Sequence, residues 1–181
     1  MYVLAVVGSP RKGGNTDVLV DRVLEGAASV GADARKVYLG DLDIAPCRGC
    51  LSCERTGECV QRDDMAWLYD EVVRADALVL GTPVYWWGPS AQLKVFVDRW
   101  YALIARKDSL AGKRVVVVAP YADSDPGTPR HLFGMMEESL EYLGMTLQGT
   151  LGVTASDIGD AAGDEAGIRR AFELGRSLCS G

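Results

Sequence analysis

The chain has 181 residues, 48% of them hydrophobic and 24% charged, and nineteen basic against twenty-five acidic side chains give a net charge of −6. This length suits one domain spanning residues 1–181, and the acidic balance argues against a nucleic-acid partner. No apolar run approaches the roughly 20 residues that cross a bilayer, and the first residues lack the pattern of an export signal, so we expect a cytoplasmic protein without a membrane partner.

Strand and helix patterns alternate along the chain. Apolar, β-branched runs predict five buried strands over residues 2–7, 34–39, 77–81, 114–119 and 146–153. Helical spacing predicts five helices, one capped by residues 15–17 and the others over 63–74, 90–104, 130–143 and 167–179. Such alternation predicts an α/β fold, a parallel sheet with helices on both faces. Ligands of these sheets bind at the carboxyl ends of the strands, so the loops after the first, third and fourth strands are the candidate site.

The loop after the first strand joins a buried strand to a helix start, where free N–H groups and the helix dipole favour an anion. It carries polar donors, positive charge and two glycines, namely Ser9, Arg11, Lys12, Gly13, Gly14, Asn15 and Thr16. The loop lacks the Gly-Lys-Ser/Thr ending of a nucleotide-triphosphate site, and no Gly-x-Gly-x-x-Gly of a dinucleotide site is present. We therefore expect it to bind a single terminal phosphate.

The loop after the third strand runs Gly81-Thr82-Pro83-Val84-Tyr85-Trp86-Trp87-Gly88-Pro89-Ser90. Three consecutive aromatic rings are costly to expose, so a flat apolar ligand or a partner subunit is expected to cover them. The prolines stiffen the backbone, which would present N–H groups at fixed positions to the polar edge of a heterocycle.

Four cysteines follow the second strand with the spacing Cys47-x2-Cys50-x2-Cys53-x5-Cys59. Short steps of this kind let four sulfur atoms turn toward one centre, which suits a cluster of iron and sulfide, or zinc. The alternative is that the thiols only pack the loop, and the spacing does not decide between these interpretations. The single histidine, His131, argues against a Ser-His or Cys-His hydrolase, and no catalytic acid, base or nucleophile is predicted.

Three motifs together resemble the flavodoxin-like family of NAD(P)H-dependent FMN reductases and quinone reductases. They are Gly8-Ser9-Pro10-Arg11-x3-Asn15-Thr16, residues 81–86, and residues 91–99, which read AQLKVFVDR. The resemblance implies the sheet order 2-1-3-4-5, with NAD(P)H as hydride donor and a quinone, a flavin or a similar flat molecule as acceptor. It also implies an FMN site, with the phosphate on Ser9, Arg11, Asn15 and Thr16 and the ring lined by Pro83, Val84, Tyr85 and Trp86. In the loop after the fourth strand, Pro120 and Tyr121 stand where many members have a glycine-rich turn, and they complete the predicted site.

The resemblance also implies partners. The predicted helix over 90–104 carries more apolar residues than one sheet contact needs, namely Leu93, Phe96, Val97, Trp100 and Ile104, and members commonly dimerise through this region. We expect a homodimer or homotetramer. The cysteine spacing resembles the iron–sulfur flavoproteins of the same fold family, which hold a [4Fe-4S] cluster near FMN and exchange electrons with a ferredoxin-like partner. A flavin-binding electron carrier or redox sensor without turnover is a further alternative.

Overall fold

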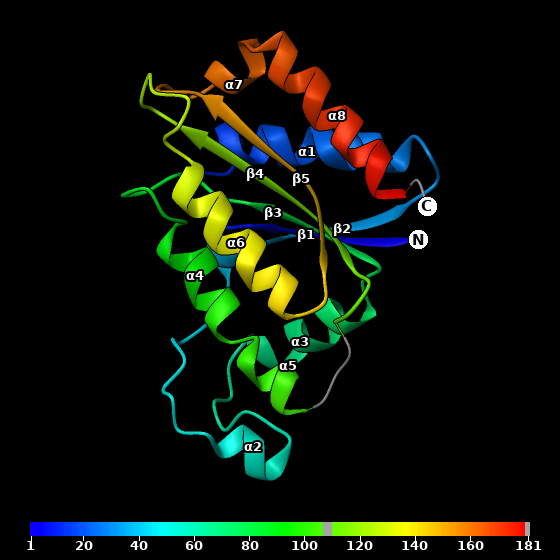
Figure 1. The fold of residues 1–181 in the computed structure, drawn as a ribbon, viewed down its shortest axis with the longest axis vertical. Helices are drawn as coiled ribbons and strands as arrows, with labels where there is room; N and C mark the ends of the chain where they lie inside the picture. Colours follow the sequence, from blue (N-terminus) through cyan, green and yellow to red (C-terminus); the bar gives the residue numbers. More distant parts are fainter. Residues whose placement is uncertain (107–109, 180–181) are drawn as a thin grey trace.

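The computed structural model describes residues 1–106 and 110–179. Five parallel strands form one sheet in the order β2-β1-β3-β4-β5 (Figure 1). The strands are β1 (Tyr2–Val7), β2 (Asp33–Tyr38), β3 (Ala77–Gly81), β4 (Arg114–Tyr121) and β5 (Thr146–Thr154). The parallel strands and their order confirm the predicted fold class and the predicted sheet order.

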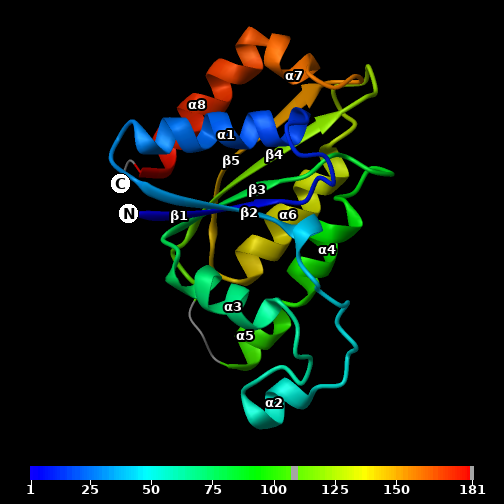
Figure 2. The same cartoon turned by 180° about the vertical axis from the view of Figure 1, so that it is seen from behind.

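Helices cover both faces of this sheet. One face carries α1 (Asn15–Ala28), α8 (Glu165–Cys179) and the short α7 (Asp160–Gly163). The other carries α3 (Met65–Arg74), α4 (Ala91–Asp98), α5 (Tyr101–Ala105) and α6 (Arg130–Tyr142). The small helix α2 (Ser52–Thr56) lies beyond α3 and α5, away from the sheet, as Figures 1 and 2 both show. A short 3₁₀ turn, η1 (Leu39–Asp41), leads from β2 toward α2.

The apolar core lies in two layers, one on each face of the sheet. All of β3 and the last five residues of β1 are buried, as strands covered on both faces must be. On the α8 face, the helices α1 and α8 contact each other at glycines. A Cβ on Gly26 would lie 2.0 Å from the Phe172 carbonyl oxygen, and a Cβ on Gly175 would lie 1.8 Å from the Val23 carbonyl oxygen. Only glycine permits this close approach.

The long helix predicted over 90–104 is two helices. The chain tightens between them, where Trp100 N–H donates to the Val97 carbonyl at 3.0 Å and Ala102 N–H donates to the Arg99 carbonyl at 3.2 Å. These i to i−3 bonds end α4 and begin α5 at the point where the Arg99 side chain enters the interior, with 2% of Arg99 exposed.

Other boundaries also differ from the predictions. Strand β4 is two residues longer, so Pro120 and Tyr121 belong to the strand end and not to a loop. Strand β2 ends at Tyr38, and the short helices α2 and α7 were not predicted, since each has too few residues for a helical period to show. No helix in residues 1–106 or 110–179 is long and apolar enough to cross a bilayer.

Candidate functional site

A hollow of about 160 Å³ opens at the carboxyl edge of the sheet, above the ends of β1, β3 and β4. The strand ends meet there because Val7 lies level with both Tyr38 and Gly81 in the neighbouring strands. Nine of the ten predicted flavin residues line it: Ser9, Arg11, Asn15, Thr16, Pro83, Val84, Tyr85, Pro120 and Tyr121. The structure thus brings the two predicted loops and the end of β4 together, while the individual roles of these residues stay predictions.

The start of α1 is open toward an anion. Gly14 is the N-cap and makes no side-chain capping bond, so the cap predicted at residues 15–17 is absent and the helix begins with free N–H groups. Ser9 is buried, and its Oγ accepts from the Arg11 N–H at 3.2 Å, which shapes the loop from inside. Within the described residues, the Arg11 guanidinium makes no ion pair or hydrogen bond and the Thr16 hydroxyl has no partner, so both are available to a ligand.

The Asn15 side chain, which lines the hollow, also bonds to the chain itself. Its Nδ2 donates to the Asp157 carbonyl at 2.7 Å, and its Oδ1 accepts from the N–H groups of Gly159 at 3.0 Å and Ala161 at 3.2 Å. The Asn15 amide therefore joins the start of α1 to the loop after β5. Because this loop also lines the hollow through Ser156 and Ile158, the Asn15 side chain shapes the wall of the site.

The loop after β3 is held by a buried serine that the sequence did not single out as part of the site. Ser90 Oγ donates to the Gly8 carbonyl at 2.7 Å and accepts from the Leu93 N–H at 3.2 Å, which caps α4. The Ser90 N–H donates to Thr82 Oγ1 at 2.9 Å. A serine before an amphipathic helix indicates an N-cap, but its bond to a residue 82 positions away has no sequence signal.

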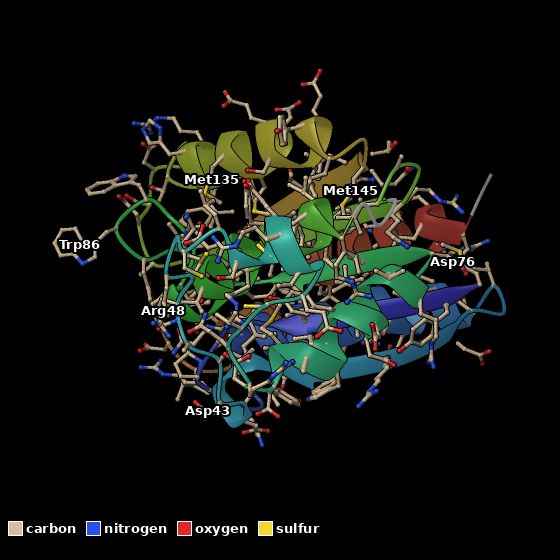
Figure 3. All side chains as sticks on the ribbon, turned by 90° about the horizontal axis from the view of Figure 1, so that it is seen from below. Asp43, Arg48, Asp76, Trp86, Met135 and Met145 are labelled. Atoms are coloured by element: carbon tan, nitrogen blue, oxygen red, sulfur yellow. The ribbon has the colours of Figure 1, made fainter. Side chains whose placement is uncertain are left out.

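The tip of this loop is a tight two-residue turn. Tyr85 and Gly88 exchange backbone hydrogen bonds of 2.9 and 3.0 Å, and the two residues between them have positive φ, 50° at Trp86 and 61° at Trp87. Bulky residues rarely adopt this conformation. It turns Trp86 outward, where it is 91% exposed and projects from the molecule (Figure 3), so Trp86 is the predicted flavin residue that does not line the hollow.

The same bonds decide which N–H groups the loop can offer. The Val84 N–H donates to the Pro120 carbonyl at 3.0 Å, and the N–H groups of Tyr85 and Gly88 are used within the turn. In this part of the described chain, free N–H groups remain only at Trp86 and Trp87. The donors predicted for the polar edge of a heterocycle are therefore confined to the tip.

The four clustered cysteines line a separate cavity of about 30 Å³ together with Tyr69, Arg99 and Tyr101. Cys47 and Cys50 are exposed, and Cys53 and Cys59 are half-buried. Hydrogen bonds from the Ser52 backbone and side chain lower the pKa of the Cys50 thiol, whereas burial raises that of Cys53. Among the residues that the structure describes, no three of Cys, His, Asp or Glu converge closely enough to hold a metal ion. The thiols thus share one cavity without closing on an ion, and this cavity has no lining residue in common with the hollow.

A buried ion pair anchors the cysteine loop to the helical layer. The Arg99 guanidinium lies 2.5 Å from Asp63 Oδ2, donates to the Ala45 carbonyl at 2.7 Å and contacts Cys59 Sγ at 3.5 Å. Burial alone would raise the pKa of Asp63, but hydrogen bonds from Arg99 and from the Ala45 N–H hold it below its ordinary value. Asp63 was predicted only as the first residue of the helix over 63–74. Its pairing with Arg99, 36 residues away, was missed.

Comparisons with known proteins agree with this architecture. The family model described as NADPH-dependent FMN reductase matches residues 1–156. An iron-sulfur flavoprotein of Archaeoglobus fulgidus is 33% identical over 98% of this chain and 79% of its own length. A Bacillus subtilis protein, provisionally described as an NAD(P)H-dependent FMN-containing oxidoreductase, is 27% identical over 96% of each chain. The solved NAD(P)H:quinone oxidoreductase of Methanothermobacter marburgensis shares the fold, with a TM-score of 0.79 and 19% identity over all of this chain and 97% of that one.

The chain belongs to the NADPH-dependent FMN reductase family. It is an oxidoreductase with FMN as its cofactor and NAD(P)H as its co-substrate, which confirms the predicted enzyme class. The hollow fits FMN on its own geometry, because an uncapped helix start and an unpaired arginine at one end suit a phosphate while prolines and tyrosines at the other suit a flat ring.

The ion pair between Asp63 and Arg99 predicts a pH-dependent stability. Asp63→Asn leaves a buried cation without its counter-ion, and we expect a loss of about 3 kcal/mol of unfolding free energy at neutral pH. Because the folded-state pKa of Asp63 lies below its ordinary value of 3.8, its contribution is present above that value and is lost as pH falls through the folded-state pKa. The variant should therefore lose less unfolding free energy than the wild type as the pH is lowered. Urea unfolding at a series of pH values from neutral to acid measures this difference.

Asp98→Asn is the matched control, because Asp98 pairs with Lys94 at 2.5 Å but keeps 46% of its side chain exposed. An exposed pair contributes at most about 1 kcal/mol. Equal losses in the two variants, or an unchanged acid profile in Asp63→Asn, would show that the buried pair does not stabilise the loop.

Proposed function

We propose that this chain binds FMN in the hollow at the carboxyl edge of the sheet, receives hydride from NADPH or NADH, and reduces a flat acceptor such as a quinone or a free flavin. The observation that carries the proposal is the open start of α1 beside Arg11, at one end of a hollow whose other end is lined by Pro83, Val84 and Tyr85. A phosphate and a planar ring joined by a short chain match these two ends.

At the phosphate end, the chain contributes charge and directed donors. The free N–H groups of the first turn of α1 and the Arg11 guanidinium would bind the phosphate oxygens, and the Thr16 hydroxyl would add a further hydrogen bond. Asn15 and Ser90 support this arrangement indirectly, since they join the loop to its two neighbours. The phosphate would therefore meet donors that are already in place, which lowers the entropic cost of binding.

At the ring end, the chain excludes water and fixes orientation. FMN, when bound, supplies reversible acceptance of a hydride and donation of electrons. Pro83 and Val84 line one part of the hollow and Pro120 and Tyr121 another, so a flat ring would lie between stiff, apolar segments. No acid or base is required of the protein, and His131 is exposed and does not line the hollow.

The proposal predicts turnover that depends on both FMN and an acceptor. Protein loaded with FMN should oxidise NADPH or NADH rapidly when a quinone or a free flavin is added. Arg11→Met removes the unpaired cation and should lower the affinity for FMN about tenfold or more, because charge-assisted hydrogen bonds to phosphate are strong. Riboflavin, which lacks the phosphate, should bind the variant and the wild type alike. Flavin titration and nicotinamide absorbance measure both effects.

Arg170→Met is the control, because Arg170 lies on the exposed surface of α8, 3.7 Å from Glu173. It should leave FMN affinity unchanged. Bound FMN without turnover on any quinone or flavin would indicate an electron carrier or sensor. An unaltered FMN affinity in Arg11→Met would mean that the phosphate lies elsewhere.

We propose, as a second candidate function, that the cysteine loop holds a [4Fe-4S] cluster and exchanges electrons with a ferredoxin-like partner. The observation that favours it is the single cavity onto which Cys47, Cys50, Cys53 and Cys59 all open. The guanidinium of the buried Arg99, which pairs with Asp63, also lies 3.5 Å from Cys59 Sγ and would donate a hydrogen bond to a thiolate there. These four side chains are the donor set that such a cluster takes.

Protein isolated without oxygen tests this candidate. We expect about four iron atoms and as many acid-labile sulfides per chain, and their loss in Cys50→Ser with FMN still bound. Cys179→Ser is the matched control, because Cys179 lies on α8 outside the cavity and should keep the iron. Absence of iron after anaerobic reconstitution, or equal iron in both variants, would contradict the cluster.

A homodimer or homotetramer and a cytoplasmic location stay predictions. Three of the apolar residues predicted for subunit contact, Leu93, Phe96 and Trp100, pack inside the chain's own core. Support for assembly comes instead from an open groove of about 410 Å³ between α4, α5 and α6, where Ile104 is 39% and Tyr142 81% exposed.

A further inference from the structure

A buried carboxylate lies behind the loop between β1 and α1. Asp17 is 4% exposed, does not line the hollow, and accepts a hydrogen bond of 2.7 Å from the Gly13 N–H through Oδ2. Gly13 has φ +68°, a conformation that favours glycine, and the space that a Cβ would occupy there is open. The bond from the Gly13 N–H to Asp17 joins the glycine turn to the first turn of α1.

Strand β2 surrounds this carboxylate with partners. Lys36 Nζ lies 2.8 Å from Asp17 Oδ1, and the Tyr38 hydroxyl lies 3.0 Å from both Asp17 oxygens. Lys36 and Tyr38 reach the same carboxylate because alternate residues of a strand face the same side. Lys36 also pairs with Asp21 at 2.5 Å. The Tyr38 ring is flanked by Lys36 and by Lys12, which itself pairs with Asp41.

The ionisation of Asp17 follows from these contacts. Burial would raise its pKa, but hydrogen bonds from Lys36, the Gly13 N–H and Tyr38 outweigh burial and hold the pKa of Asp17 below its ordinary value. The pKa of Lys36 is raised by the two carboxylates it contacts, although burial opposes this. Asp17 and Lys36 therefore form a charged pair.

This position creates an electrostatic conflict that Lys36 resolves. The loop that would hold the FMN phosphate on its outer side has the Asp17 carboxylate on its inner side, and two anions so placed repel each other. The Lys36 ammonium offsets the charge of the buried Asp17 carboxylate, and it also pairs with Asp21, which lies one helical turn further along α1 and is half exposed to solvent. Without Lys36, the uncompensated Asp17 carboxylate would lower the affinity for an anion bound on the other side of the loop by roughly tenfold or more.

We propose that Asp17 and Lys36 are positioning residues of the phosphate site, with Asp17 fixing the Gly13 turn and Lys36 cancelling the charge that this tether introduces. The inference rests on the proposed FMN site. It adds that Lys36 removes a repulsion between Asp17 and the phosphate, which affects the binding of FMN but not that of riboflavin. It predicts that position 17 needs a hydrogen-bond acceptor, and that position 36 needs a cation only while residue 17 is charged.

Titration of apoprotein with FMN and with riboflavin tests the pair. Lys36→Met should lower the affinity for FMN by roughly tenfold or more and leave the affinity for riboflavin unchanged. Adding Asp17→Asn to Lys36→Met should restore FMN affinity to within about threefold of the wild-type value. The amide oxygen still accepts a hydrogen bond from the Gly13 N–H, while the negative charge is gone. Adding Asp17→Ala instead should not restore it, since the tether is lost. Lys94→Met, on the exposed pair with Asp98, is the control and should behave as wild type.

Two results would overturn the inference while leaving the FMN site standing: equal weakening of FMN and riboflavin in Lys36→Met, or failure of Asp17→Asn to rescue it. Equal binding of FMN and riboflavin by the wild type would overturn the phosphate site itself, and this inference with it. Each apoprotein variant is also unfolded while its circular dichroism is recorded. A cooperative transition shows that the measured affinities refer to folded protein.

Discussion

The unpaired N–H groups at the start of α1 are the constraint around which this end of the molecule is built. The buried strand β1 ends at Val7 and the helix α1 begins at Asn15, so the backbone donors of the helix start face outward at the carboxyl edge of the sheet. The helix has no capping side chain, and Gly14 occupies that position. An anion is the partner that these groups lack, and the neighbouring Arg11 has the sign of charge to attract one.

Three sets of contacts hold this loop before any ligand arrives. Ser90 joins it to the loop after β3, Asn15 joins it to the loop after β5, and Asp17 joins its glycine turn to α1. Each uses hydrogen bonds to backbone atoms, which fix the chain without adding bulk to the hollow. Donors fixed in this way bind with less loss of conformational freedom than mobile ones. The cost is a carboxylate near an anion site, which Lys36 compensates.

The sequence predicted the parts of this structure that depend on local pattern. The five strands and the anion loop followed from apolar periodicity and from glycine and proline positions. The strand order and the residues of the hollow followed from the family resemblance, which motifs such as Gly8 to Thr16 carry. The sequence did not predict contacts across long separations. Arg99 pairs with Asp63 and Asn15 binds the loop after β5, and in both cases each residue alone has a simpler local interpretation. The outward Trp86 was missed because positive φ at a tryptophan is rare and has no sequence signal.

The molecule thus has two chemically distinct regions, a hollow at the sheet edge and a thiol-lined cavity beyond the helical layer. Amide hydrogen exchange with and without FMN separates them most directly. The account predicts that FMN protects amides in residues 8–18 and 82–90 and leaves residues 47–59 unchanged. Protection confined to residues 47–59, or none in 8–18, would contradict it.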